Sequence, residues 1–278
     1  AEEQPVLPKG NNLSLHLLEL FTSRVAKVGM TDGIRQVLQE ESDALRAYYE
    51  QAGILIARPV GGTSCRLAIS AKGGTNAENH NHNDVGSYAV ALGSETMVGD
   101  QGGPNSYPGD YFNGDAPQKY KIKGSFGHPV PVVDGRTQSS GGKAKGVVLQ
   151  KEFTNEKDVF SIDYTSAYST PNLDKLIRTF VYDRQGKGSF TVGDEFTAKT
   201  PIRFETAITT RADWKILDDT HLLLATDSEQ MIVAIEASGK VAFTSETIEV
   251  NSPAYTRIGI ALKNQSKEGY IRLKMYTK

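Results

Sequence analysis

Histidine is scarce in this chain, and three of its five histidines lie in or beside two polar, glycine-rich segments, residues 73–86 and 99–127. Two of the three, His80 and His82, stand two positions apart and are followed by Asp84. On an extended strand these three side chains would project to the same face, because side chains alternate with a period of two. Imidazole nitrogen together with carboxylate oxygen suits zinc or non-haem iron. The spacing therefore predicts a metal site, whose ligands could be oriented by the interleaved Asn79, Asn81 and Asn83.

The other histidines and the single cysteine limit this hypothesis. His16 and His221 are interpreted as ordinary hydrogen-bonded residues of the surface or the core. A His-x-His pair alone is a weak metal signal, but a third histidine, His128, beside a segment of the same kind strengthens it. Cys65 is the only cysteine, which excludes an intrachain disulfide and a zinc finger built from thiolates.

Two other interpretations of these residues stay open. Cupin-like metal oxygenases also place His-x-His on a strand, but they need a carboxylate shortly afterwards, where this chain has Tyr88 and Ala89. The second alternative is a carbohydrate-binding or interface module without chemistry of its own. Its sugar platform would be formed by four aromatic residues, Tyr107, Tyr111, Phe112 and Tyr120.

The elements that must position these residues are mostly strands. From residue 53 onward, short runs rich in Val, Ile and Tyr are bounded by Gly, Asn, Asp or Pro. A dozen or more strands without helical crossovers favour a mainly β fold, a large antiparallel β-sandwich. The long polar segments between strands are where binding groups usually lie. The predicted strands are residues 53–58, 66–70, 87–92, 130–134, 146–153, 159–168, 176–183, 189–196, 202–210, 231–237, 241–250, 257–263 and 270–276.

The first fifty residues differ, because their apolar residues recur at helical spacing. One amphipathic helix is predicted from Leu17, Phe21, Val25 and Val28. Thr31 is a suitable N-cap for a second short helix. That helix would bury Ile34, Val37 or Leu38, Leu45 and Tyr48. We therefore predict a helical arm over residues 1–52, followed by the sandwich over residues 53–278.

Composition excludes several classes of protein. The 31 basic and 33 acidic residues give a net charge of −2, so there is no electrostatic case for a nucleic-acid partner. No apolar run approaches the roughly 18 residues that a membrane span needs. The first five residues hold neither a starting methionine nor a targeting segment. That start fits a mature end left by signal cleavage as well as an arbitrary boundary.

Three separated blocks of this sequence resemble the signature of the heparinase II/III-like polysaccharide lyases. They are residues 79–88 (Asn-His-Asn-His-Asn-Asp-Val-Gly-Ser-Tyr), 97–100 (Met-Val-Gly-Asp) and 125–135 (Ser-Phe-Gly-His-Pro-Val-Pro-Val-Val-Asp-Gly). The blocks keep the family's order and spacing across about residues 53–138, whereas the later strands agree only in general character. The resemblance implies that the chain is the C-terminal β-sandwich domain of such a lyase, with the tail of a preceding helical domain.

Carried over residue by residue, the resemblance implies a metal site that differs from the group of His80, His82 and Asp84 suggested by spacing. A zinc ion would be bound by His82, Asp100 and His128, and it would organise the loop that shapes the cleft. His80 would point toward the substrate cleft. Asp84 would support a ligand or cap a turn.

The resemblance also implies the reaction, β-elimination on a uronic acid within an acidic polysaccharide such as a glycosaminoglycan or alginate. A base removes the C5 proton, an acid protonates the departing O4, and donors stabilise the anion formed between these steps. In the family a tyrosine from the stretch after the zinc-binding acid reaches into the cleft. Here Tyr111 is the first choice and Tyr107 the second, with His80 as a further catalytic residue. Tyr120 is interpreted as a packing residue.

Members of the family complete the cleft with an N-terminal α/α toroid. This sequence predicts only two helices before residue 53, and His16 is a poor substitute for the toroid's groups. The resemblance therefore implies a toroid domain as partner and an isolated chain that is nearly inactive. It also implies a periplasmic or secreted protein. Three cationic residues are interpreted as solvated loop residues rather than polymer contacts: Arg136, Lys143 and Lys145.

Overall fold

The structure is a computed structural model that describes residues 45–104, 106–249 and 254–278. Strands make up 55% of it and helices 4%, which confirms the predicted mainly β, antiparallel fold. The two predicted helices, apart from the end of the second, lie outside the described residues, so they and the domain boundary near residue 52 stay predictions. Among the described residues, no helix has the length and apolar character needed to cross a membrane.

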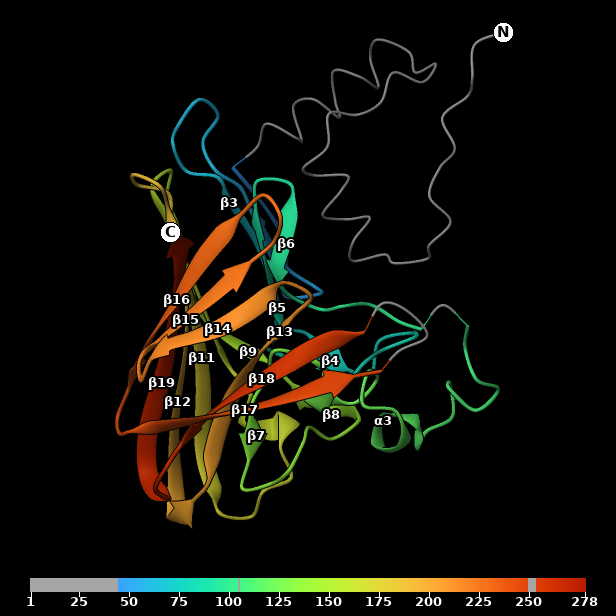
Figure 1. The fold of residues 1–278 in the computed structure, drawn as a ribbon. Helices are drawn as coiled ribbons and strands as arrows, with labels where there is room; N and C mark the ends of the chain where they lie inside the picture. The colour runs from blue at the N-terminus through green and yellow to red at the C-terminus, as the bar shows by residue number, and fades with distance from the viewer. Residues whose placement is uncertain (1–44, 105, 250–253) are drawn as a thin grey trace, which may run out of the picture.

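The larger layer of the sandwich is an eight-stranded antiparallel sheet (Figure 1). Its strands alternate buried and exposed residues, as the period of two requires when one face is covered. In sheet order they are β14 (Asp213–Asp218), β15 (His221–Ala225), β16 (Gln230–Ala237), β19 (Ser266–Thr277), β12 (Ser189–Ile202), β11 (Leu173–Asp183), β10 (Lys157–Asp163) and β9 (Val147–Phe153).

Two smaller sheets form the facing layer. One is ordered β1 (Arg46–Tyr49), β2 (Ile54–Ala57), β3 (Leu67–Lys72), β5 (Tyr88–Leu92) and β6 (Glu95–Val98). The other is ordered β17 (Val241–Ile248), β18 (Tyr255–Leu262), β13 (Phe204–Thr210) and β7 (Val132–Val133).

The two smaller sheets meet where β6 ends beside β13. The N–H of Gly99 donates to the carbonyl of Thr209 at 3.0 Å, and Oγ1 of Thr210 donates to the carbonyl of Met97 at 2.6 Å. Oγ1 of Thr209 donates in turn to the carbonyl of Gly99 at 2.6 Å. These bonds fix the position of the chain just before Asp100.

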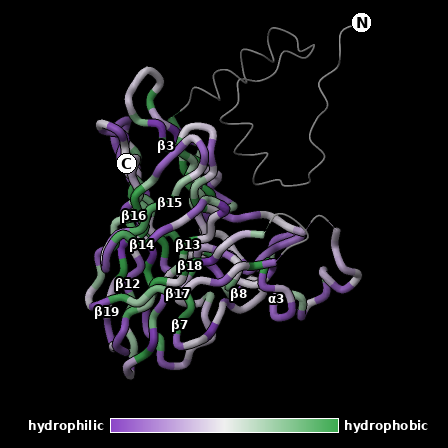
Figure 2. The backbone as a smooth tube through the Cα atoms, viewed as in Figure 1, coloured by the Kyte–Doolittle hydropathy of each residue, from purple (hydrophilic) through white to green (hydrophobic). Residues whose placement is uncertain are grey.

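One continuous apolar core fills the space between the layers. Phe180 stacks between Phe160 and Phe190, with ring centroids 5.9 and 6.2 Å apart, and Phe196 of β12 stacks on Phe204 of β13 at 4.6 Å. Figure 2 shows hydrophobic residues recurring along the strands and hydrophilic residues gathering in the loops near α3. Burial of this apolar surface is the main stabilising contribution to the fold.

Short elements at one side of the sandwich carry the two polar, glycine-rich segments. They are the strand pair β4 (Thr75–Asn76) and β8 (Gly141–Lys145), the helix α3 (Ala116–Lys119), and the 3-10 helices η1 (Ser125–Gly127) and η2 (Thr165–Ala167). Figure 1 shows β4, β8 and α3 together beside the ends of β17 and β18.

Strand positions differ from the sequence prediction in a few places. Tyr48 is predicted on a helix but lies on β1, which pairs with β2. Its ring packs against Phe153 at 5.7 Å and Phe160 at 5.8 Å, and such long-range contacts override a local helical pattern. The predicted strands 130–134 and 159–168 are shortened to β7 and β10. Six of the described strands are additional to the predicted ranges: β1, β4, β6, β8, β14 and β15.

Candidate metal centre

Three loops that are distant in sequence bring His82, Asp100 and His128 together. His82 lies between β4 and β5, Asp100 follows β6, and His128 directly follows η1. One potential ligand atom from each residue lies within 4.8 Å of the other two. The structure thus groups the three residues that the resemblance implies as metal ligands.

The imidazole of His128 is oriented so that one of its nitrogens could bind a metal ion. Its side chain is buried, and its Nε2 lies 3.0 Å from the carbonyl oxygen of Ile122. Because a carbonyl only accepts, Nε2 carries the proton and Nδ1 presents a lone pair in the neutral ring. Nδ1 has no hydrogen-bond partner and lies 3.7 Å from Oδ1 of Asp100. A buried acceptor without a partner, aimed at a carboxylate, is what a cation between them would satisfy.

The charge states of the other two ligands fit a cation as well. Burial is the main cause that lowers the pKa of His82 to about 4, and nearby His128 adds to it, so His82 is neutral at pH 7. Burial alone would raise the pKa of Asp100, but His128, His82 and the N–H of Gly102 outweigh it and the pKa is lowered. The Gly102 N–H donates to Oδ1 of Asp100 at 2.8 Å.

Tyr111 adjoins the same group. Its hydroxyl lies 3.2 Å from Nε2 of His82, and its side chain is only 1% exposed. Burial raises the pKa of Tyr111, and Tyr107 and Asp100 contribute to the shift. The phenol is therefore neutral over the physiological range and shares a hydrogen bond with Nε2 of His82.

Tyr107 and Tyr120 lie on either side of Tyr111, with ring centroids 5.0 and 5.3 Å away. Tyr107 is 46% exposed, whereas Tyr120 is partly buried against Tyr111 and donates its hydroxyl to Asp110 at 2.5 Å. This contact agrees with the packing role predicted for Tyr120. Of the two predicted catalytic tyrosines, only Tyr107 is open to solvent.

The local hypothesis that His80, His82 and Asp84 share one ion is wrong. Residues 79–84 form turns rather than a strand, and His80 has a φ of +57°. His80 is exposed and packs edge to face on Phe112 at 4.9 Å, while Asp84 accepts a hydrogen bond from Lys72. The cupin-like alternative also needs the His-x-His pair on a strand, which the structure does not have.

His80 instead lines a pocket of about 280 Å³ together with Phe112 and Lys123. The Lys123 ammonium is 4.9 Å from the ring centres of both Tyr111 and Phe112 and donates to the carbonyl of Tyr111 at 2.5 Å. Burial lowers the pKa of Lys123. A polar, partly cationic pocket therefore lies beside the metal group.

A buried arginine under the site fixes two of the three ligand loops. Nη1 of Arg178, on β11, donates at 2.7 Å both to the carbonyl of Gly86 and to the carbonyl of Pro129. The same guanidinium is held in a bidentate pair with Asp194 at 2.7 and 2.6 Å. Arg178 thus joins the loop after His82 to the residue after His128.

Two further buried groups support the loops. Gln138 donates to the carbonyl of Val85 at 2.7 Å and accepts from its N–H at 3.1 Å. Tyr255 donates to the carbonyl of Gly127 at 2.8 Å. A Cβ on Gly127 would lie 2.3 Å from the carbonyl oxygen of Lys121 and 2.8 Å from the Tyr255 hydroxyl, so only glycine fits beside His128.

The remaining sequence candidates lie elsewhere. His221 is bonded to Asp218 at 3.0 Å on the surface, which confirms the ordinary role predicted for it. His16 is outside the described residues. Arg136, Lys143 and Lys145 are exposed.

Comparison with known proteins gives a likeness of fold. No family model matches the chain, and no curated protein sequence matches it. Among solved structures, heparinase III matches with a TM-score of 0.65 at 18% identity, covering 84% of this chain and 36% of that one. Heparan sulfate lyase HepC from Pedobacter heparinus matches with a TM-score of 0.68 at 14% identity, covering 87% of this chain and 39% of that one.

The chain therefore spans little more than a third of the length of the lyases that it matches. This likeness confirms, at the level of the fold, the resemblance drawn from the three sequence blocks: this chain has the fold of the C-terminal β-sandwich domain of heparinase III and heparan sulfate lyase.

Proposed function

We propose that this chain is the β-sandwich domain of a polysaccharide lyase that cleaves a uronic-acid-containing polysaccharide by β-elimination. One observation carries the proposal: His82, Asp100 and His128 converge within 4.8 Å in a sandwich whose fold is that of heparinase III. The motif blocks and the fold are independent supports, because identity to the matched structures is only 14–18%.

The metal we propose is zinc. Two neutral imidazoles and one carboxylate form a donor set that zinc commonly takes, with a fourth position left open. When bound, the ion would supply positive charge and would tie the loops of His82, Asp100 and His128 together. The orphaned Nδ1 of His128 facing Asp100 is the feature of this structure that fits it.

The chain's own groups suit a part of the elimination. In that reaction a base takes the C5 proton, the C4–O4 bond breaks, a C4–C5 double bond forms, and an acid returns a proton to O4. We propose that Tyr111 or Tyr107 transfers a proton at the phenolic oxygen, with Tyr111 positioned by His82. His80, exposed beside Phe112, would face the sugar. Lys123, near these groups, favours an acidic substrate.

Other groups of the active cleft would come from an N-terminal α/α toroid of a longer protein. The coverage of only 36–39% of the matched lyases supports this arrangement. An enzyme acting on such polymers would work in the periplasm or outside the cell. Without the toroid, we expect this chain to have almost no activity of its own, because removing cooperating acid–base groups commonly costs several orders of magnitude in rate.

The decisive experiment assays the longer protein on heparan sulfate, hyaluronan and alginate and follows the absorbance of the unsaturated uronate product. We expect product from at least one polymer with the longer protein and at most a trace with this chain alone. Absence of product from every polymer, with metal bound and the fold intact, would contradict the proposed reaction.

A non-catalytic sugar-binding module remains the second candidate function because of one specific feature. Tyr107 and Phe112 are 46% and 50% exposed, and their ring centroids lie 5.2 Å apart. Such a pair is an aromatic surface on which a sugar can stack. Polymer binding by the longer protein without any unsaturated product, and unaffected by chelation, would favour this function.

A further inference from the structure

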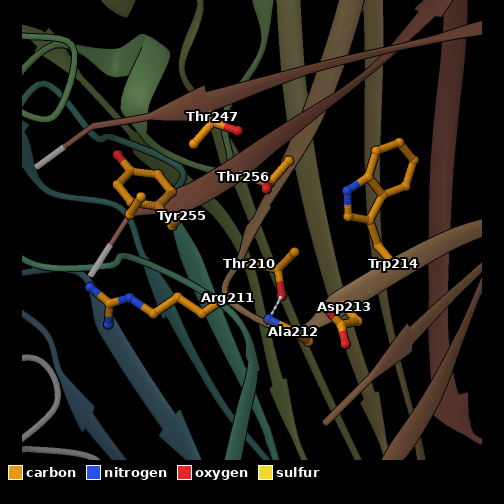
Figure 3. A pocket seen from close by; sticks show the side chains of 9 residues that line it. Thr210, Arg211, Ala212, Asp213, Trp214, Thr247, Tyr255 and Thr256 are labelled. Carbon is orange, nitrogen blue, oxygen red and sulfur yellow. Dashed lines mark hydrogen bonds between the residues drawn. The ribbon is translucent and has the colours of Figure 1, made fainter. Parts of the chain in front are cut away.

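A second pocket, of about 430 Å³, lies beside the chain segment that follows Asp100. Its walls come from the link between β13 and β14 and from the ends of β17 and β18. Figure 3 shows Trp214 on one side and Tyr255 and Arg211 on the other, with Thr247 and Thr256 between them. A pocket of this size lies within the ~300–1,000 Å³ typical of ligand sites.

Two residues that line this pocket donate hydrogen bonds to the loops of the metal group. Nη2 of Arg211 donates to the carbonyl of Gln101 at 3.0 Å, one residue beyond Asp100. The hydroxyl of Tyr255 donates to the carbonyl of Gly127 at 2.8 Å, one residue before His128. A molecule bound here would therefore lie next to the loops that hold two of the three proposed ligands.

The lining has the chemistry of a carbohydrate site rather than of a hydrophobic ligand site. The Trp214 indole is partly exposed, and Figure 3 shows its ring nitrogen turned toward the threonine side chains. An aromatic ring packs on the C–H face of a sugar, while hydroxyl, carboxylate and guanidinium groups bind sugar hydroxyls. Here those groups are the hydroxyls of Thr247 and Thr256 and the carboxylate of Asp213.

Arg211 adds a preference for an anionic sugar. Its side chain is partly buried, and a guanidinium binds carboxylates and sulfates through charge-assisted hydrogen bonds.

We propose that this pocket is a saccharide-binding subsite that holds an acidic sugar of the polymer next to the residue being cleaved. The proposal deepens the proposed function and rests on it, since the acidic polymer is the ligand. Trp214 supplies the stacking surface and Arg211 the anion contact. Both residues bind the polymer and take no part in proton transfer.

Trp214 is also the only tryptophan of this chain, so its fluorescence reports on this pocket directly. The first test titrates the chain with size-defined acidic oligosaccharides from heparan sulfate and alginate, and with a neutral cello-oligosaccharide as control. We expect an acidic oligosaccharide to change the Trp214 emission in a saturable way and the neutral one to leave it unchanged. No emission change with any acidic oligosaccharide would overturn the proposal.

The second test compares variants by calorimetric titration with the same oligosaccharides. Removing a charged hydrogen bond weakens binding by about tenfold or more, so Arg211→Gln should raise the Kd by that factor. Trp214→Ala should raise it by about three- to tenfold, the range of an aromatic contact. Arg272→Gln is the matched control, because Arg272 lies on the eight-stranded sheet and pairs with the exposed Glu236. An unchanged Kd in folded Arg211→Gln and Trp214→Ala would contradict the subsite.

A third measurement separates failure of this inference from failure of the proposed function. In the longer protein, Arg211→Gln should raise KM with little change in kcat, which is the signature of lost binding alone. Product formation with KM unchanged in Arg211→Gln would overturn the subsite and leave the lyase standing. Trp214 quenching by acidic oligosaccharides without any product would support saccharide binding here and contradict the elimination.

Discussion

The hydroxyl of Tyr111 lies 3.2 Å from Nε2 of His82. This contact joins two residues that the sequence resemblance assigns to different tasks, one to proton transfer and the other to metal binding. A substitution at either residue should therefore affect both proton transfer and metal binding. Through this hydrogen bond the loop of residues 106–115 is attached to His82 and so to the group of His82, Asp100 and His128.

The proposed zinc site predicts how metal affinity should change in three variants. We expect Asp100→Asn and His82→Ala each to lower zinc affinity at least tenfold, because a ligand is lost while two remain. His80→Ala should leave the affinity within about twofold, since His80 is exposed and outside the group. Competition with a chromogenic chelator measures the zinc affinity of all three variants. Equal losses in His80→Ala and His82→Ala would show that the ligand set is different.

Tyr111 and Tyr107 can be distinguished in the longer protein. Tyr111→Phe removes one hydroxyl and keeps the buried ring, so folding should be retained. If Tyr111 transfers a proton, kcat should fall by about 10²–10⁴, with KM little changed. Tyr107→Phe is the matched variant, because Tyr107 is the exposed neighbour 5.0 Å away. A large kcat loss in Tyr107→Phe and none in Tyr111→Phe would transfer the role to Tyr107.

The buried pair Arg178–Asp194 predicts a large stability loss. Both side chains are at most 1% exposed, so Asp194→Ala leaves a desolvated guanidinium without its charge partner. We expect the free energy of unfolding to fall by about 3–5 kcal/mol, measured by urea denaturation. The control Glu236→Ala breaks the exposed pair with Arg272 and should cost at most ~1 kcal/mol. A similar decrease in the free energy of unfolding in the two variants would contradict the large contribution expected from the buried pair.

Among the described residues, six buried tyrosines predict alkaline unfolding. Burial is the main cause that raises their pKa above the ordinary 10.0; they are Tyr88, Tyr111, Tyr164, Tyr168, Tyr182 and Tyr255. Above pH ~10 the unfolded chain loses phenol protons that the folded chain keeps, so stability is complete below pH 10 and falls as pH rises further.

Phenolate absorbance followed together with circular dichroism checks this prediction. We expect the buried tyrosines to ionise only as the strands unfold. In denaturant, all twelve tyrosines should titrate together. Titration of every tyrosine near pH 10 with the sheet signal intact would contradict the assignment.

Most of the sandwich could be predicted from the sequence because its strands carry their own signal. Short apolar runs bounded by turn residues predicted β5, β9 and β16 within one residue of their observed bounds. β1 could not be found in this way, because Tyr48 and Arg46 are fixed by partners about a hundred residues away, Phe160 and Asp158. Pairing of this kind is set by tertiary contacts and not by local propensity.

Of the residues that form the site, only those within the family motif could be predicted from the sequence. His82, Asp100 and His128 came from the family resemblance, whereas spacing alone gave the wrong trio with His80 and Asp84. Periodicity failed there because His80 has a positive φ that breaks the strand geometry. The sequence did not indicate the supporting roles of Arg178, Gln138 and Tyr255. A single sequence does not distinguish a buried arginine or glutamine from one on the surface.

The three grouped side chains come from loops that become neighbours only after the two small sheets have met at the Gly99–Thr209 contact. If the group binds an ion as proposed, the ion should therefore be captured at a late step, on a sandwich that is already assembled.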